Sequence, residues 1–129
     1  MGKGELLHAE LTDQILGGCY AVYKVFGFGF LEVVYRNALA VELARRGLIV
    51  KKEVPVEILY LGVPVGTYRI DLLVNDKVIV ESKTQKAITV ADEKQLINYL
   101  KATPHEVGLV FNFGPEPKFQ RIVYSNSRK

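Results

Sequence analysis

The 129-residue sequence contains little cysteine and no long apolar run, and each absence excludes a class of protein. A single cysteine, Cys19, excludes an internal disulfide and any zinc or iron–sulfur site held by cysteines. The apolar runs are too short to span a bilayer, and the N-terminus lacks a basic region followed by an apolar one. We therefore expect a cytoplasmic protein without a membrane anchor, with Cys19 buried on a helix.

The sequence also has few histidines and only a small excess of basic over acidic residues. His8 and His105 are isolated, without metal-ligand partners at useful spacing, so surface or turn roles suit them better. Seventeen basic and fourteen acidic residues give a net charge of +3, which only slightly favours a polyanionic partner. No repeat, linker or low-complexity segment interrupts the chain. We predict one compact domain over residues 1–129.

Apolar spacing predicts two helices at the start of the chain. The first spans about 10–26, with Thr12 or Asp13 near its start, and ends before "GFG" at 27–29. The second spans about 30–46 and stops at Gly47. The apolar positions that carry this pattern are Leu11, Ile15, Cys19, Val22 and Phe26 in the first helix, and Leu31, Val34, Ala38 and Val41 in the second.

Beyond the second helix, apolar residues occur at every second position, which predicts strands. Val54, Val56, Ile58 and Tyr60 alternate with their neighbours, "LGVP" at 61–64 turns the chain, and strands follow at 65–74 and 78–84. Thr89 and Asp92 form a capping-box pattern that opens a helix reaching about Leu100. Two more strands are predicted at 107–113 and 119–124. The expected fold is α/β, a mixed β-sheet flanked by α-helices in the order ααβββαββ.

Charged residues interrupt two apolar strands in "RIDLLVNDKVIVESK", residues 69–83. A three-residue turn at 75–77 places Asp71 opposite Glu81, whereas a two-residue turn would place Asp71 opposite Val80. In the first register the Cβ atoms lie about 5 Å apart, and two full charges at that distance repel by roughly 3 kcal/mol. A shared proton, a neighbouring cation or a bound metal must offset this repulsion.

Lys83 lies two residues beyond Glu81 and therefore on the same face of its strand. Two acids with an adjacent lysine suit a hard divalent cation and one activated water. The alternative is a solvated hairpin edge, in which Lys83 pairs with Glu81 or Asp71.

Two shorter motifs add candidate site residues. In "GFLEVVY", residues 29–35, Glu32 and Tyr35 share a helix face; the alternative for Glu32 is an i,i+4 pair with Arg36. In "QLINY", Gln95 and Tyr99 also share a face, where they could hold a lysine or a phosphate, or merely line a polar surface.

Together these motifs closely resemble the GxxExxY proteins, a branch of the PD-(D/E)XK nuclease superfamily. The resemblance runs from about Leu11 to Tyr124 and includes "VPVEILYLGVPVG", "LINYLKAT" and "VGLVFNFG". It implies a restriction-endonuclease-like core and a site that uses Mg²⁺ or Mn²⁺. It also implies that Gln95 and Tyr99 form the Q-x-x-x-Y motif of RecB-like helicase–nucleases.

The resemblance also implies a role for each site residue. Asp71, Glu81 and the backbone carbonyl of Ser82 would be metal ligands, with Glu32 as an additional acid from the helix. Lys83 would be the catalytic lysine, Gln95 would complete the catalytic set, and Tyr99 and Tyr35 would contact nucleic acid. Arg69, with Lys86 and Lys94, could contact phosphate near the site, and the alternative for all three is a solvated face. Ser82 departs from the apolar residue usual at its position, and its side chain should point to the opposite face.

We therefore expect a metal-dependent nuclease that hydrolyses phosphodiester bonds, with DNA as the substrate. Two alternatives remain: a non-catalytic nucleic-acid-binding module, and a dimeric interaction protein that uses the apolar "VFNF" region, 110–113. A small domain could also need a second copy or another protein partner to complete a substrate channel. The seven tyrosines are scattered, and their positions indicate no stacking platform for single strands.

Overall fold

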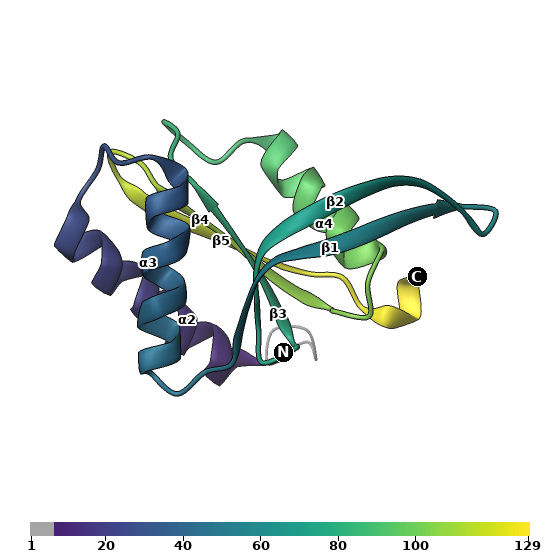
Figure 1. The fold of residues 1–129 in the computed structure, drawn as a ribbon, viewed down its shortest axis with the longest axis horizontal. Helices are drawn as coiled ribbons and strands as arrows, with labels where there is room; N and C mark the ends of the chain where they lie inside the picture. Colours follow the sequence, from purple (N-terminus) through teal and green to yellow (C-terminus); the bar gives the residue numbers. More distant parts are fainter. Residues whose placement is uncertain (1–6) are drawn as a thin grey trace.

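The chain forms two helices, three strands, a helix and two strands in the expected order ααβββαββ (Figure 1). The structure, a computed structural model, describes residues 7–129. No helix in this range has the length and apolar character needed to cross a membrane. The elements are α2 (Ala9–Phe26), α3 (Glu32–Arg45), β1 (Val50–Tyr60), β2 (Val63–Val74), β3 (Val78–Lys83), α4 (Val90–Lys101), β4 (Val107–Phe113), β5 (Pro117–Val123) and a short 3₁₀ turn at Asn126–Arg128.

The five strands form one mixed sheet in the order β1-β2-β3-β4-β5. Among the described strands, only β3 and β4 pair in parallel, because α4 carries the chain back across the sheet between them. These two strands lie in the interior of the sheet, and every residue of β4 is buried. The "VFNF" region therefore offers no surface for a dimer, and this expectation is wrong.

Helices cover both faces of the sheet, and each face has its own apolar core. Helices α2 and α3 cover one face, where Ile15, Leu39 and Phe111 belong to the first core. Helix α4 covers the other face, where Ile79 and Leu96 belong to the second. The prediction of a sheet flanked by helices is thus confirmed.

Helix α2 begins at Ala9, one residue before the predicted start of the 10–26 helix, with Thr12 and Asp13 near its start as expected. Thr12 lies in the first turn, and its hydroxyl donates a hydrogen bond to the Ala9 carbonyl at 2.9 Å. A threonine can therefore occur within a first turn as well as before it. The buried positions Ile15, Cys19 and Val22 follow the predicted spacing.

Helix α3 turns a different face to the core than its apolar spacing predicts. Leu31 and Val41 are 75% and 71% exposed, whereas Tyr35, Leu39 and Leu43 are fully buried. Apolar residues occur on several sides of this helix, so spacing alone does not define the buried side. The bulky i, i+4, i+8 series fills the space above the sheet instead.

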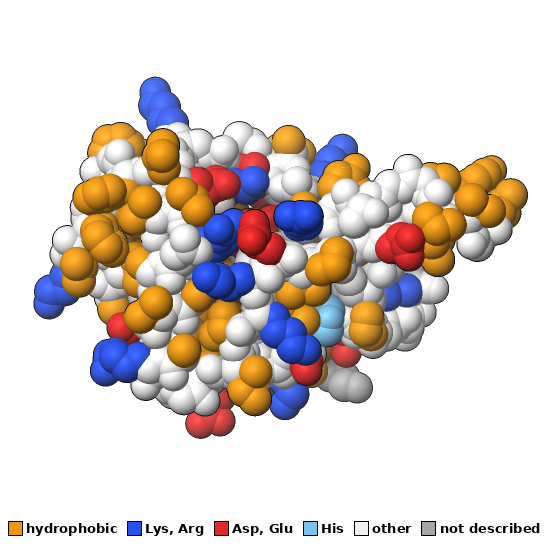
Figure 2. All heavy atoms as spheres, viewed as in Figure 1, with side chains coloured by type: hydrophobic (Ala, Val, Ile, Leu, Met, Phe, Trp, Pro, Cys, Tyr) orange, Lys and Arg blue, Asp and Glu red, His pale blue; other side chains and the backbone are white. Residues whose placement is uncertain are grey.

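Strands β1 and β2 form a long hairpin that projects beyond the rest of the molecule (Figure 1). The hairpin turns at Leu61 and Gly62, whose φ angles of 50° and 79° suit a two-residue turn, and not over the whole of 61–64. The predicted alternation of buried residues reaches Ile58 but not Tyr60, which is 67% exposed. Apolar side chains cover the hairpin tip (Figure 2).

Candidate active site

The β2–β3 hairpin has the three-residue turn and the register that bring Asp71 to the level of Glu81. Val74, Leu73 and Leu72 pair with Val78, Ile79 and Val80 in turn. At the next position, the carboxylates of Asp71 and Glu81 each accept a hydrogen bond from a backbone amide of the opposite strand. The Asp71 amide donates to Glu81 Oε2 at 2.7 Å, and the Ser82 amide donates to Asp71 Oδ2 at 2.8 Å. These reciprocal bonds hold the two acids side by side.

Strand β2 changes its surroundings at Asp71. Ile70 packs in the core under α4, whereas Leu72 packs in the core under α2 and α3. On the neighbouring strand, Glu53 has a left-handed φ of 52° between two regularly paired stretches of the β1–β2 ladder. β2 pairs with β3 only over Leu72, Leu73 and Val74, so the acid pair lies where this pairing ends.

Burial makes both acids difficult to ionise. Glu81 is only 5% exposed, and burial, together with the negative charge of Asp71, raises its pKa to about 8. Burial also raises the pKa of Asp71 above its usual range. Within residues 7–129, neither acid forms an ion pair. The alternative in which Lys83 pairs with one of them is therefore not found.

Lys83 is directed to α4 instead. Its Nζ donates to Gln95 Oε1 at 3.4 Å. Of the roles open to Gln95, holding a lysine is the one the structure shows. The helix that carries Gln95 begins with the predicted capping box: Asp92 N donates to Thr89 Oγ1 at 3.1 Å, and Thr89 N donates to Asp92 Oδ2 at 2.9 Å.

A buried asparagine fixes the loop between Lys83 and α4. Asn112 is fully buried; its Oδ1 accepts from Gln85 N at 3.0 Å, and its Nδ2 donates to Gln85 O at 2.8 Å. The Gln85 side chain in turn donates to the Asp92 carboxylate. Sequence reasoning missed Asn112, although an amide inside the apolar run "VGLVFNF" was a usable signal.

Glu32 lies in the first turn of α3, on the rim of the same site. Arg36 does not pair with it, because the Arg36 guanidinium bonds to Glu53 at 3.3 Å. Partial burial raises the pKa of Glu32, against the opposing effect of the Lys83 charge and with a smaller contribution from Asp71. Acidic and basic side chains gather between α3 and the β1–β2 hairpin (Figure 2). Hydrogen bonds thus link Asp71 to Glu81 and Lys83 to Gln95, while Glu32 is near enough for the Lys83 and Asp71 charges to affect its pKa.

Comparison with known proteins agrees with this geometry. The family model described as "PD-(D/E)XK nuclease superfamily" matches residues 9–122. The chain belongs to the PD-(D/E)XK nuclease superfamily. No curated protein matches the chain. The crystal structure of SSO0001 superposes on it with a TM-score of 0.54 at 20% sequence identity, covering 92% of this chain and 59% of that one. That likeness concerns the fold, and the expected restriction-endonuclease-like core is confirmed.

The acid pair of this PD-(D/E)XK domain fits a small divalent cation. Asp71 Oδ1 and Glu81 Oε1 accept no hydrogen bond from residues 7–129, so one oxygen of each carboxylate is available. Within that range no group of three or more His, Cys, Asp or Glu side chains is close enough to form a metal cage. Mg²⁺ does not need one, since it is held by one or two carboxylates and retains several waters.

Ser82 occupies the position between the two charged residues of the PD-(D/E)XK strand. It lies opposite Phe111, a residue of the first core, so its side chain points away from the acids as alternation predicts. Its hydroxyl is buried and has no hydrogen-bond partner among the described residues. Its backbone amide binds Asp71. The contribution of Ser82 to the site is therefore made by its main chain.

The three residues expected to contact nucleic acid differ in exposure. Tyr35 is fully buried; its hydroxyl donates to Gly27 O at 2.5 Å and accepts from Phe30 N at 3.3 Å, so its role is to support the turn before α3. Tyr99 is 3% exposed, and burial, helped by the charges of Glu81 and Asp71, raises its pKa to about 12. Arg69 alone of the three presents an exposed side chain, on β2.

Proposed function

We propose that this chain is a nuclease of the GxxExxY branch that hydrolyses phosphodiester bonds in DNA. The observation that carries the proposal is the pair of buried acids, Asp71 and Glu81. Backbone donors hold them side by side, and within residues 7–129 neither forms an ion pair with a basic side chain. Membership of the PD-(D/E)XK nuclease superfamily supports the same reaction class.

Asp71, Glu81 and the backbone carbonyl of Ser82 would hold Mg²⁺ or Mn²⁺, with Glu32 on the α3 side. When bound, the ion would neutralise phosphate charge and lower the pKa of a water. Lys83 donates a hydrogen bond that orients the attacking water or a phosphate oxygen, and Gln95 holds the ammonium group in place for this task. The buried surroundings strengthen these charge interactions.

A cleavage assay tests the proposal. We would incubate the purified protein with labelled single- and double-stranded DNA and RNA in Mg²⁺, Mn²⁺ or EDTA. The wild type is expected to cleave DNA only with metal. Glu81→Ala should abolish cleavage, and Lys83→Ala should reduce it by about a hundredfold or more. Glu116→Ala removes an exposed acid in the β4–β5 turn and should cleave like wild type.

Two results would contradict the nuclease assignment. Cleavage that persists in EDTA or in Glu81→Ala would show that the activity does not come from this site. A folded wild-type protein that neither binds metal nor cleaves any substrate would favour a nucleic-acid-binding module without catalysis.

A further inference from the structure

A groove runs between α4 and the β1–β2 hairpin, starting at the active site. One hollow of about 330 Å³ is lined by Gln95, Lys94, Tyr68 and Asn98, among others. A second of about 470 Å³ is lined by Tyr68, Asn98 and Lys101, among others. Because Tyr68 and Asn98 line both hollows, the two form one groove. Its near end is at Gln95, which holds Lys83 of the acid-and-lysine site.

The α4 wall of this groove carries polar and basic side chains at helical spacing. Lys94, Asn98 and Lys101 are exposed and follow one another at i, i+4 and i+7 on one side of the helix. Within residues 7–129, neither lysine forms an ion pair. The Lys101 ammonium lies 5.5 Å from the centre of the Tyr124 ring. The acid Glu57 lines only the far hollow.

The hairpin wall supplies an aromatic surface. Tyr68 is 53% exposed, and its ring centre lies 5.9 Å from that of the buried Tyr99, with 55° between the ring planes. Tyr99 thus supports one side of the Tyr68 ring, and the exposed remainder faces the groove. An aromatic ring beside a row of cations is the combination that binds unpaired nucleotides, because every base has a face that stacks.

We propose that this groove binds single-stranded DNA leading to or from the active site. A base stacks on Tyr68, and the adjoining phosphates lie against Lys94 and Lys101. Each hollow has the volume of a small-molecule site, so each has room for about one nucleotide. The proposal deepens the proposed function, since it names the strand on which the nuclease acts, but the binding itself does not depend on cleavage.

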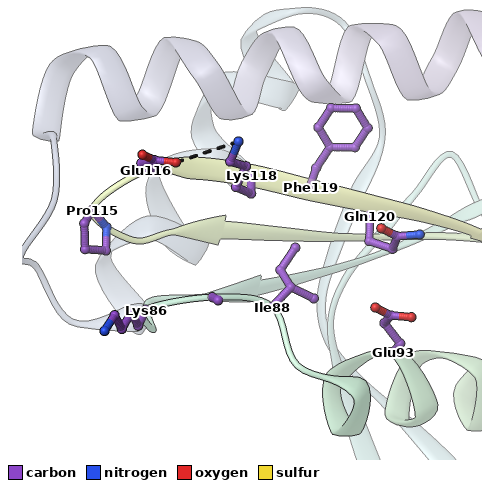
Figure 3. A pocket seen from close by; sticks show the side chains of 9 residues that line it. Lys86, Ile88, Glu93, Pro115, Glu116, Lys118, Phe119 and Gln120 are labelled. Carbon is purple, nitrogen blue, oxygen red and sulfur yellow. Dashed lines mark ion pairs between the residues drawn. The ribbon is translucent and has the colours of Figure 1, made fainter.

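A different hollow, of about 540 Å³, lacks this combination (Figure 3). It lies between the loop after β3, the β4–β5 turn and the start of α4. Its lysines Lys86 and Lys118 are matched by the acids Glu93 and Glu116, and Lys118 pairs with Glu116 at 3.7 Å. It therefore provides a matched control lysine outside the groove.

The test is DNA binding measured in EDTA, where metal-dependent cleavage cannot occur. We would follow the fluorescence anisotropy of a short labelled oligothymidine and of a labelled duplex. The wild type is expected to bind the single strand more tightly. Tyr68→Ala should weaken that binding roughly tenfold, whereas Tyr68→Phe retains the ring and should bind like wild type. Tyr60→Ala removes an exposed tyrosine at the hairpin tip and serves as the control.

The salt dependence of binding tests the lysine in the same assay. Loss of one phosphate contact to a single strand should reduce the slope of log affinity against log salt by about 0.7. We expect this change in Lys94→Gln and none in Lys118→Gln. Tyr68→Ala binding like wild type, or a duplex bound at least as tightly as the single strand, would overturn the proposal.

Cleavage measured in parallel separates the two proposals. Metal-dependent cleavage with no effect of Tyr68→Ala on binding or rate would leave the nuclease assignment intact and reject the groove. Single-strand binding that depends on Tyr68, in a protein that cleaves nothing, would support the groove and reject the nuclease.

Discussion

At the scale of single residues, the candidate active site places two acids where stability would favour apolar side chains. Glu81 is buried next to Asp71, and each acid disfavours ionisation of the other. Burying a charge without a partner costs folding free energy. Function at such a position is therefore expected to conflict with stability.

This conflict predicts that Glu81→Gln stabilises the protein in the absence of metal. Glutamine retains an oxygen that can accept from the Asp71 amide but removes the second acid, so we expect a gain of about 1–2 kcal/mol. Thermal unfolding in EDTA should show a midpoint higher by a few degrees. Mn²⁺ should raise the midpoint of the wild type but not of the variant. The exposed substitution Glu116→Gln should change neither value, and a lower midpoint for Glu81→Gln would contradict the prediction.

Local sequence patterns predicted the charged residues of the site but not the residues that surround them. Asp71, Glu81 and Lys83 are recognisable because they interrupt apolar strands, and the short turn fixes their register. Asn112 was missed because one amide in a buried strand produces no periodic pattern. Tyr68 was missed because its position beside Tyr99 of α4 depends on a tertiary contact, which no local pattern predicts.

At the scale of elements, the position of α4 on the sheet sets the contact between Gln95 and Lys83. The capping box predicted where this helix begins, because its signal is local. The inward face of α3 was predicted wrongly, because several of its sides are apolar and only the tertiary contacts choose among them. Local signals define where elements begin and end better than how they pack.

The close packing of α4 on the sheet predicts that a larger residue at Gly108, on β4 beneath the helix, destabilises the protein. A Cβ atom there would lie 2.5 Å from Leu96 Cδ1 and 2.9 Å from its Cγ, and Leu96 is fully buried. Gly108→Ala should therefore lower the free energy of unfolding by about 1–3 kcal/mol, measured by urea denaturation. Gly66→Ala is the matched control, since no atom lies within 4 Å of its added Cβ, and its effect should stay within about 0.5 kcal/mol. Equal effects of the two substitutions would contradict this packing.

At the scale of the whole molecule, β2 takes part in both the central sheet and the projecting hairpin. Its C-terminal part pairs with both β1 and β3 in the sheet, and its N-terminal part pairs only with β1 in the projecting hairpin. The acid pair lies where these parts meet, and the groove along α4 lies beneath the projecting part. β2 thus connects the acid pair to the groove that is proposed to bind single-stranded DNA.

This division predicts two levels of hydrogen-exchange protection. Amides of β3 and β4 are expected to exchange slowest, because both strands are paired on two sides and almost entirely buried. Amides at 57–66 should exchange early, since β1 is an edge strand and Leu59, Tyr60 and Leu61 are exposed at the tip. Exchange followed by mass spectrometry at two protein concentrations checks both levels. Protection at the tip that rises with concentration would contradict an open hairpin, because a second copy of the chain would then be covering it.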